Sequence, residues 1–273
     1  MANPPEARVR QAMGAGGLNI PSAGRGVIGL VVIHVVAWVV YLLMLRLGVE
    51  FAARELALVP RDFLLHGRLW QAVTGVLLHA PSDVGHLLFN MLFLWWFGSP
   101  IEGWWGARGL IRAYIACALG GVLLTVLVGA GVALLAPGSG LGHLWTGAHL
   151  GASGAVLGLT VCWGAVLWNE RMNFMFFGEM RVRTFILVLV GIQVLVALSY
   201  DGTSSTSHFG GILVGYLYGR GWLRPARLRN WLTHRRVQAQ AEERKKKRAR
   251  FEVIEGGAEP RWQRRDDDEP MVH

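Results

Sequence analysis

Six apolar stretches, none of which contains an Asp, Glu, Lys or Arg, constrain this chain more than any other feature. They comprise residues 26–45, 84–101, 113–136, 150–168, 184–200 and 202–219. A helix needs about 20 apolar residues to cross the hydrocarbon core of a bilayer, with a range of roughly 17–25. Charged residues make up only 16% of the chain, against about 25% in soluble domains, which excludes an ordinary soluble enzyme. The sequence therefore predicts an all-α polytopic membrane protein with a bundle of six transmembrane helices.

The distribution of Lys and Arg predicts the side of the membrane that each end faces. Basic residues precede the first stretch, follow the second, fourth and sixth, and are absent after the third and fifth. Both termini are therefore expected in the cytoplasm, with an amphipathic external loop at 49–83 that lies at the membrane interface. We expect a cytoplasmic segment at 1–25, a membrane domain at 26–223 and a charged cytoplasmic tail at 224–273. A bacterial inner membrane is the expected location.

The formal net charge of +9 comes mainly from the tail, where all three lysines form the run 245–247. Beside a membrane span, such a tail favours contact with anionic headgroups over nucleic acid, so the lipid bilayer is the expected partner. Cys117 and Cys162 lie within apolar stretches and are expected to be small buried side chains. The first stretch is too long for the core of a signal peptide, so we expect it to be retained.

Polar side chains within the apolar stretches lie at a similar depth. His86 and Asn90 are four residues apart and share a face of the second span, Ser153 opens the fourth, and His208 lies near the start of the sixth. All three spans are expected to begin outside, so the four side chains should converge below the external surface. Polar groups within a span cost free energy and tend to mark function. His34, which has no polar neighbour at helical spacing, is instead expected to be packed or to snorkel.

The residue types at this depth favour nucleophilic catalysis. A serine hydroxyl is a weak nucleophile unless a base such as histidine takes its proton, which predicts Ser153 as the nucleophile and His208 as the base. Attack on a carbonyl builds an oxyanion that needs preorganised donors. The backbone N–H of Ser153 at a helix start and the side chains of His86 and Asn90 are the predicted donors.

Glycines accompany both predicted catalytic residues. Gly151 and Gly154 flank the serine, where the absence of side chains leaves room for a substrate backbone. Gly211 and Gly215 follow the histidine at a four-residue spacing that allows close helix packing in membranes. These glycines are predicted to let the fourth and sixth spans approach until Ser153 and His208 meet.

The segment 151–158 around the serine, the histidine with its following glycines, and the His-xxx-Asn pair together resemble the rhomboid intramembrane serine proteases. The resemblance covers about residues 70–219. It implies a Ser153–His208 dyad without a catalytic acid, and an oxyanion hole formed by His86, Asn90 and the Ser153 backbone. It also implies no cofactor, no metal, and transmembrane segments of membrane proteins as substrates, cleaved next to a small residue.

The chain departs from the family pattern at several positions. Gln71 follows Trp70 where the family usually has Arg, and is expected to loosen the first loop. Leu157 stands where many members place an aromatic ring that stacks on the histidine. His79 resembles a loop histidine of the family, and Glu102 resembles a structural acid, without a catalytic role.

Three other functions remain as alternatives. The first is a catalytically inactive relative that binds client transmembrane helices, although such proteins normally lack the serine or the histidine. A catalytic metal is disfavoured because no His-Glu-x-x-His motif and no carboxylate within a span occur. A transporter or channel would be expected to carry charged residues within its spans or matching broken helices. Asp201 lies about two helical turns from His208 and is expected to be a loop residue or a helix cap.

Overall fold

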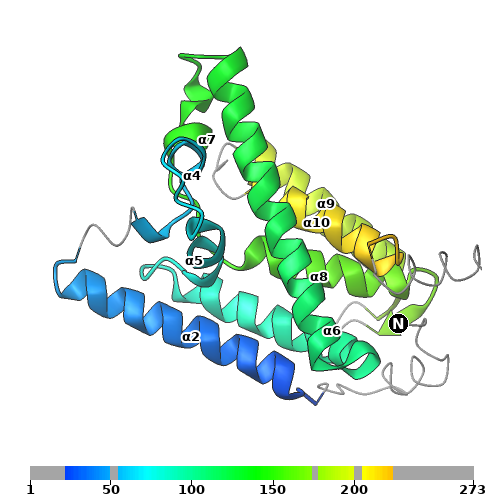
Figure 1. Ribbon diagram of the computed structural model, residues 1–273. Helices are drawn as coiled ribbons and strands as arrows, with labels where there is room; N and C mark the ends of the chain where they lie inside the picture. Colours follow the sequence, from blue (N-terminus) through cyan, green and yellow to red (C-terminus); the bar gives the residue numbers. More distant parts are fainter. Residues whose placement is uncertain (1–21, 50–54, 174–177, 200–204, 224–273) are drawn as a thin grey trace, which may run out of the picture. The chain divides into compact units, whose positions relative to one another are not determined.

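The computed structural model describes residues 22–49, 55–173, 178–199 and 205–223, which are mostly helical (Figure 1). The expected tail at 224–273, most of the expected N-terminal segment and Asp201 lie outside the described residues. The helices are α2 (Arg25–Arg46), α4 (Pro60–Leu65), α5 (Gln71–Leu77), α6 (Val84–Leu135), α7 (His143–Thr146), α8 (Ser153–Val166), α9 (Val182–Leu198) and α10 (Ser205–Gly219). A 3-10 turn, η1 (Gly140–Gly142), precedes α7, and the strands β1 (Arg171–Asn173) and β2 (Glu179–Arg181) form an antiparallel hairpin before α9.

Within the described ranges, two helices, α2 and α6, have the length and apolar composition needed to cross a membrane, while α8 and α9 are shorter apolar helices. Large apolar side chains stay exposed along α2 and α9, as lipid contact requires. Helix α8 differs, because every residue from Ser153 to Ala165 is buried. The helices α6 and α10 both pack against it.

The connection expected between the second and third spans falls within α6, which consists of two helices joined at a kink. The helix runs through residues 102–112 and is interrupted at Gly106, whose φ of 70° and ψ of 170° are not helical. A positive φ strains a residue with a Cβ, so glycine suits this position. The break divides α6 into two arms that bend sharply away from each other (Figure 1).

Glu102, just before this break, holds the start of α2. Its carboxylate accepts hydrogen bonds from the backbone N–H groups of Gly26 and Val27, at 2.7 and 2.8 Å. The first N–H groups of a helix have no partner within the helix, and a negative charge there is favourable. Since the first turn of α2 has no acidic residue of its own, Glu102 acts as a cap from 75 residues away.

Farther along α2, His34 is fully buried, as expected for a packed histidine. Its Nδ1 lies 2.7 Å from the carbonyl oxygen of Leu30, and its Nε2 lies 2.9 Å from the hydroxyl of Tyr114 in α6. Nδ1 must donate to the carbonyl, so Nε2 accepts from the tyrosine. This polar pair ties α2 to the second arm of α6.

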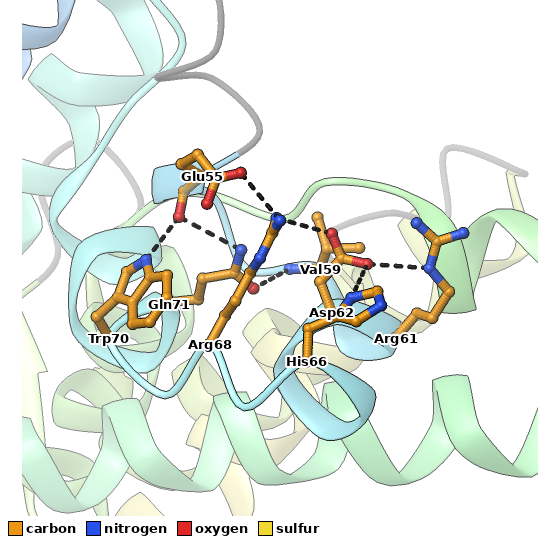
Figure 2. Close-up of polar contacts among 8 residues, drawn as sticks. All are labelled: Glu55, Val59, Arg61, Asp62, His66, Arg68, Trp70 and Gln71. Atoms are coloured by element: carbon orange, nitrogen blue, oxygen red, sulfur yellow. Dashed lines mark hydrogen bonds and ion pairs between the residues drawn. The ribbon is translucent and has the colours of Figure 1, made fainter.

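The first loop is held by hydrogen bonds from Gln71, contrary to the expectation that this residue loosens it (Figure 2). Gln71 is fully buried, and its Oε1 accepts from the backbone N–H of Val59 at 3.1 Å. Its Nε2 donates to the carbonyl oxygen of Glu55 at 3.4 Å, and the Trp70 indole donates to the same oxygen at 2.8 Å. A neutral amide suits this role because it can donate and accept at once.

The carboxylate of Asp62 in α4 contacts three basic side chains of the same loop (Figure 2). Arg61, His66 and Arg68 lie 2.9, 3.3 and 3.0 Å from its carboxylate oxygens. Burial by itself would raise the pKa of Asp62. The hydrogen bond from Arg61 and the charges of the three basic side chains outweigh that effect and lower the pKa below its ordinary value.

Candidate active site

Ser153 and His208 meet at the contact between α8 and α10. The Ser153 Oγ lies 2.7 Å from the His208 Nε2, although the two residues are 55 positions apart in the sequence. Ser153 is the first residue of α8, and His208 is the fourth residue of α10. The distance allows the serine hydroxyl to donate to the imidazole, as nucleophile activation requires.

Glycine backbones bring the two helices this close. A Cβ on Gly211 would overlap the carbonyl oxygen of Gly154, and one on Gly215 would overlap that of Gly158. A Cβ on Gly154 would in turn lie 2.6 Å from the carbonyl oxygen of Ser207. Real Cβ atoms do not approach backbone oxygens so closely, so each position requires glycine. The predicted role of these glycines in close packing agrees with this geometry.

Gly151 joins the serine to the predicted oxyanion donor His86. The φ of Gly151 is +123°, which residues with a Cβ rarely adopt. A Cβ built there would lie 3.2 Å from His86 Cε1 and 3.8 Å from Ser153 Oγ. The His86 imidazole and the Ser153 hydroxyl therefore border the same point of the backbone. An oxyanion formed next to Ser153 would be within reach of the helix start and of the His86 side of the site.

Asn90 reaches this region through other side chains. Its Nδ2 donates to the carbonyl oxygen of His86 at 2.9 Å and lies 3.3 Å from the Nε2 of His79. The backbone N–H of Ala152 donates to the same His79 nitrogen at 3.4 Å. Both amide hydrogens of Asn90 are thus engaged, and its direct contact with an oxyanion stays a prediction.

His79 therefore bridges α6 to Ala152, the residue before Ser153. The side chain is fully buried. Burial, with smaller effects from the nearby rings of His34 and His86, lowers the pKa of His79 to about 4. The ring is neutral near pH 7, and its Nε2 serves as an acceptor for Asn90 and Ala152. The sequence pattern identified His79 as a loop histidine, and the structure gives it this bridging position.

Gln193 of α9 is the residue that sequence reasoning missed. Its Oε1 lies 2.7 Å from the Nδ1 of His208, on the side of the ring opposite Ser153. A signal was available, because Gln193 is the one amide in the apolar stretch 184–200, and polar residues within spans tend to mark function. Leu157, which replaces the expected aromatic ring, is buried in α8. In the described part of the chain, no aromatic ring stacks on His208.

A small cavity lies beside the start of α8. It has a volume of about 30 Å³ and is lined by residues of the first loop, of α6 and of the segment that leads into α8, among them Gly75, Gly121, His149 and Gly151. This volume exceeds the roughly 10–15 Å³ that one water molecule needs, and the lining has polar atoms to bind it.

The site contains the chemical groups that proton transfer and acyl transfer require. Over the described ranges, no group of three or more His, Cys, Asp or Glu side chains is arranged to hold a metal ion. The site brings together a hydroxyl, an imidazole, the backbone N–H groups at the start of a helix and two further polar side chains. These groups can supply a nucleophile, a general base and donors to an oxyanion.

Comparison with known proteins identifies the class. The rhomboid domain matches residues 66–225, more than half of the chain. The chain therefore belongs to the rhomboid family of membrane proteins.

Individual relatives are more distant. The chain is 26% identical over 168 residues to the rhomboid protease GluP of Bacillus subtilis (strain 168), a match that covers 62% of this chain and 28% of that protein. It is 27% identical over 161 residues to the mitochondrial RHOMBOID-like protein 12 of Arabidopsis thaliana, covering 58% of this chain and 47% of the relative. For RHOMBOID-like protein 4 of the same plant, the identity is 29% over 150 residues, which covers 55% and 33%. The chain thus spans less than half the length of these relatives.

Proposed function

We propose that this protein is an intramembrane serine endopeptidase in which Ser153 is the nucleophile and His208 the general base. The observation that carries the proposal is the 2.7 Å contact between Ser153 Oγ and His208 Nε2, formed across two helices. Membership of the rhomboid family and the similarity to a relative named as a protease support it. A hydroxyl paired with an imidazole at a helix start has little structural purpose in a lipid-facing bundle, where glycines already provide the packing.

In the proposed mechanism, His208 Nε2 takes the proton of Ser153 as the hydroxyl oxygen attacks the scissile carbonyl. The bond between Oγ and the carbonyl carbon forms, and the negative charge moves to the carbonyl oxygen. The Ser153 backbone N–H, His86 and Asn90 stabilise that oxyanion. His208 then gives the proton to the leaving amine, which yields an acyl-enzyme. Water from the cavity beside Ser153 hydrolyses the acyl-enzyme with His208 again as base.

The proposed substrates are transmembrane segments of other membrane proteins. The apolar outer surfaces of α2 and α9 suit a protein surrounded by lipid, from which such a segment would approach. Six membrane spans, two cytoplasmic termini and a bacterial inner membrane complete the proposal. The two arms of α6 would serve as the second and third spans.

A fluorophosphonate probe tests the proposal without knowledge of the substrate, because it reacts with an activated serine. Purified wild-type protein in detergent should be labelled, whereas Ser153→Ala should not be. His208→Ala should reduce labelling and cleavage of a transmembrane substrate in liposomes by at least about 10³-fold. Near-normal cleavage by either variant would refute the dyad. If the wild type neither labels nor cleaves, the inactive relative that binds client helices becomes the better description.

The oxyanion assignment has its own test. His86→Ala and Asn90→Ala should each lower kcat by about 10- to 10³-fold, the range seen when one oxyanion donor is removed. Because these side chains would act on the transition state, KM should change much less than kcat. An unchanged kcat in Asn90→Ala would restrict Asn90 to its contacts with His79 and the backbone of His86.

A further inference from the structure

The second nitrogen of the His208 ring has a partner on a different helix. Nε2 faces Ser153, while Nδ1 lies 2.7 Å from Oε1 of Gln193. An amide oxygen accepts hydrogen bonds and cannot donate them, so Nδ1 must carry the proton of the neutral ring. Nε2 is then the unprotonated nitrogen that accepts from the serine hydroxyl. The contact therefore selects the tautomer that a general base needs.

The surroundings of Gln193 indicate that its hydrogen bond to His208 matters energetically. Gln193 is half-buried, whereas Ile192, Val194 and Leu195 beside it on α9 are exposed apolar side chains. An amide in such surroundings is costly unless it is hydrogen-bonded. The residues that α9 buries against the other helices, Val182, Phe185 and Ile186, all lie in its first half. In the second half, the hydrogen bond between Gln193 and His208 links α9 to the site.

We propose that Gln193 is a positioning residue for His208, an inference that rests on the proposed protease function. Its Oε1 fixes the ring rotation and keeps the proton on Nδ1 throughout the reaction. When Nε2 takes the serine proton, the ring becomes positively charged and the Nδ1–H to Oε1 hydrogen bond strengthens. Gln193 itself gains and loses no proton. It thereby supplies the orientation that a third, acidic residue gives in a catalytic triad, without adding a charge within the membrane.

Substitution of Gln193 gives the kinetic test. Gln193→Leu keeps the size and removes the acceptor, so the fluorophosphonate labelling rate and kcat should fall by about 10- to 100-fold, with KM nearly unchanged. Gln193→Glu restores an acceptor at the same reach and should recover most of the rate. Val194→Leu, an apolar exchange at the neighbouring exposed position, is the matched control and should label as the wild type does.

The imidazole spectrum provides a readout that a merely structural role would not change. In ¹⁵N-histidine-labelled protein, the His208 signals, assigned by their loss in His208→Ala, should report protonation at Nδ1 in the wild type. The Gln193→Leu protein should show a substantial share of the Nε2-protonated tautomer. Wild-type labelling rates together with an unchanged tautomer in Gln193→Leu would overturn the proposal. If the wild type neither labelled nor cleaved a transmembrane substrate, the protease function would fail, and the tautomer comparison would still decide the role of Gln193.

Discussion

The contact between α8 and α10 and the contact of α9 with the same site are built in opposite ways. Helix α8 is buried along its length and touches α10 backbone to backbone, so that a Cβ on Gly211 would overlap Gly154. Helix α9 buries three residues near its start, and Gly191 has open space around it. Ser153 and His208 are thus held together by close packing, whereas the second imidazole nitrogen of His208 is held by one hydrogen bond.

The difference follows from how helices associate in lipid. Lipid tails are as apolar as leucine side chains, so apolar area alone does not drive one helix onto another. Close approach of backbones between small residues does, and the glycines of α8 and α10 provide it. Helix α9 is rich in large apolar side chains, for which contact with lipid is as favourable as contact with another helix. Its attachment to the site depends on a few buried residues and on Gln193.

The largest effect should come from breaking the tight contact. Gly211→Ala forces a methyl group against the carbonyl oxygen of Gly154, and the helices must separate. Overpacking of this kind costs about 1–3 kcal/mol. A displacement of about 1 Å between Ser153 and His208 should lower kcat by roughly 10²-fold. Cleavage kinetics and thermal unfolding in the same detergent measure both consequences.

The matched control for this change lies on the loosely attached helix. Gly191→Ala meets no atom within 4 Å, and alanine in a helix interior stabilises the fold by roughly 0.4–1 kcal/mol. Its activity should therefore stay within about twofold of the wild type, a change of less than 0.5 kcal/mol. Equal losses in Gly191→Ala and Gly211→Ala would contradict the contrast between the two contacts.

A smaller effect should come from weakening the buried contact that holds the start of α9 against α8. Ile186 is buried, and its side chain packs directly on Gly164 of α8. Ile186→Ala removes that contact, so α9 should detach more often and leave His208 without Gln193. We expect the labelling rate to fall by roughly 3- to 10-fold, in line with partial local opening. Leu187→Ala, at a neighbouring position that is 60% exposed, should leave the rate unchanged. A lower labelling rate in Leu187→Ala but not in Ile186→Ala would contradict the conclusion that Ile186 holds α9 against α8.

The smallest effect on catalysis is expected in the first loop, outside both contacts. The neighbours of Asp62 hold its pKa below the ordinary 3.8 in the folded protein. The carboxylate therefore stabilises the fold fully above about pH 4, and that stabilisation is lost as the pH falls through the lower, folded-state pKa. Asp62→Asn should lower Tm by roughly 2–4 °C at pH 7, with labelling unchanged. The difference in Tm from wild type should close below pH 4, and a difference that widens in acid would contradict the assignment.

The sequence was most informative where a polar residue interrupts an apolar stretch. Ser153, His208 and His86 were found because each is rare in its surroundings and because the charge distribution gave the spans a common direction. The structure brings these three residues together. The spacing of Gly211 and Gly215 likewise indicated close packing, since four residues return to the same face of a helix.

Other features depend on contacts that no local pattern encodes. The connection expected between the second and third spans is reduced to a break at Gly106, because one glycine with a positive φ can join two helices without a longer loop. Gln71 differs from the family pattern, and only its buried position reveals that it ties the loop together. Gln193 was visible as a lone amide, but the identity of its partner depends on how α9 turns toward α10.

The cap that Glu102 provides for α2 bears on the order in which the protein is made. Helix α2 emerges from the ribosome before Glu102 has been added, since the Gly26 amide and this carboxylate are separated by 76 residues. At about 5–20 residues per second, the separation corresponds to roughly 4–15 s of synthesis. During that interval, water and lipid headgroups must satisfy the first amides of α2. The arrival of Glu102 then fixes the start of α2, and a nascent chain halted before residue 102 would lack this fixed point.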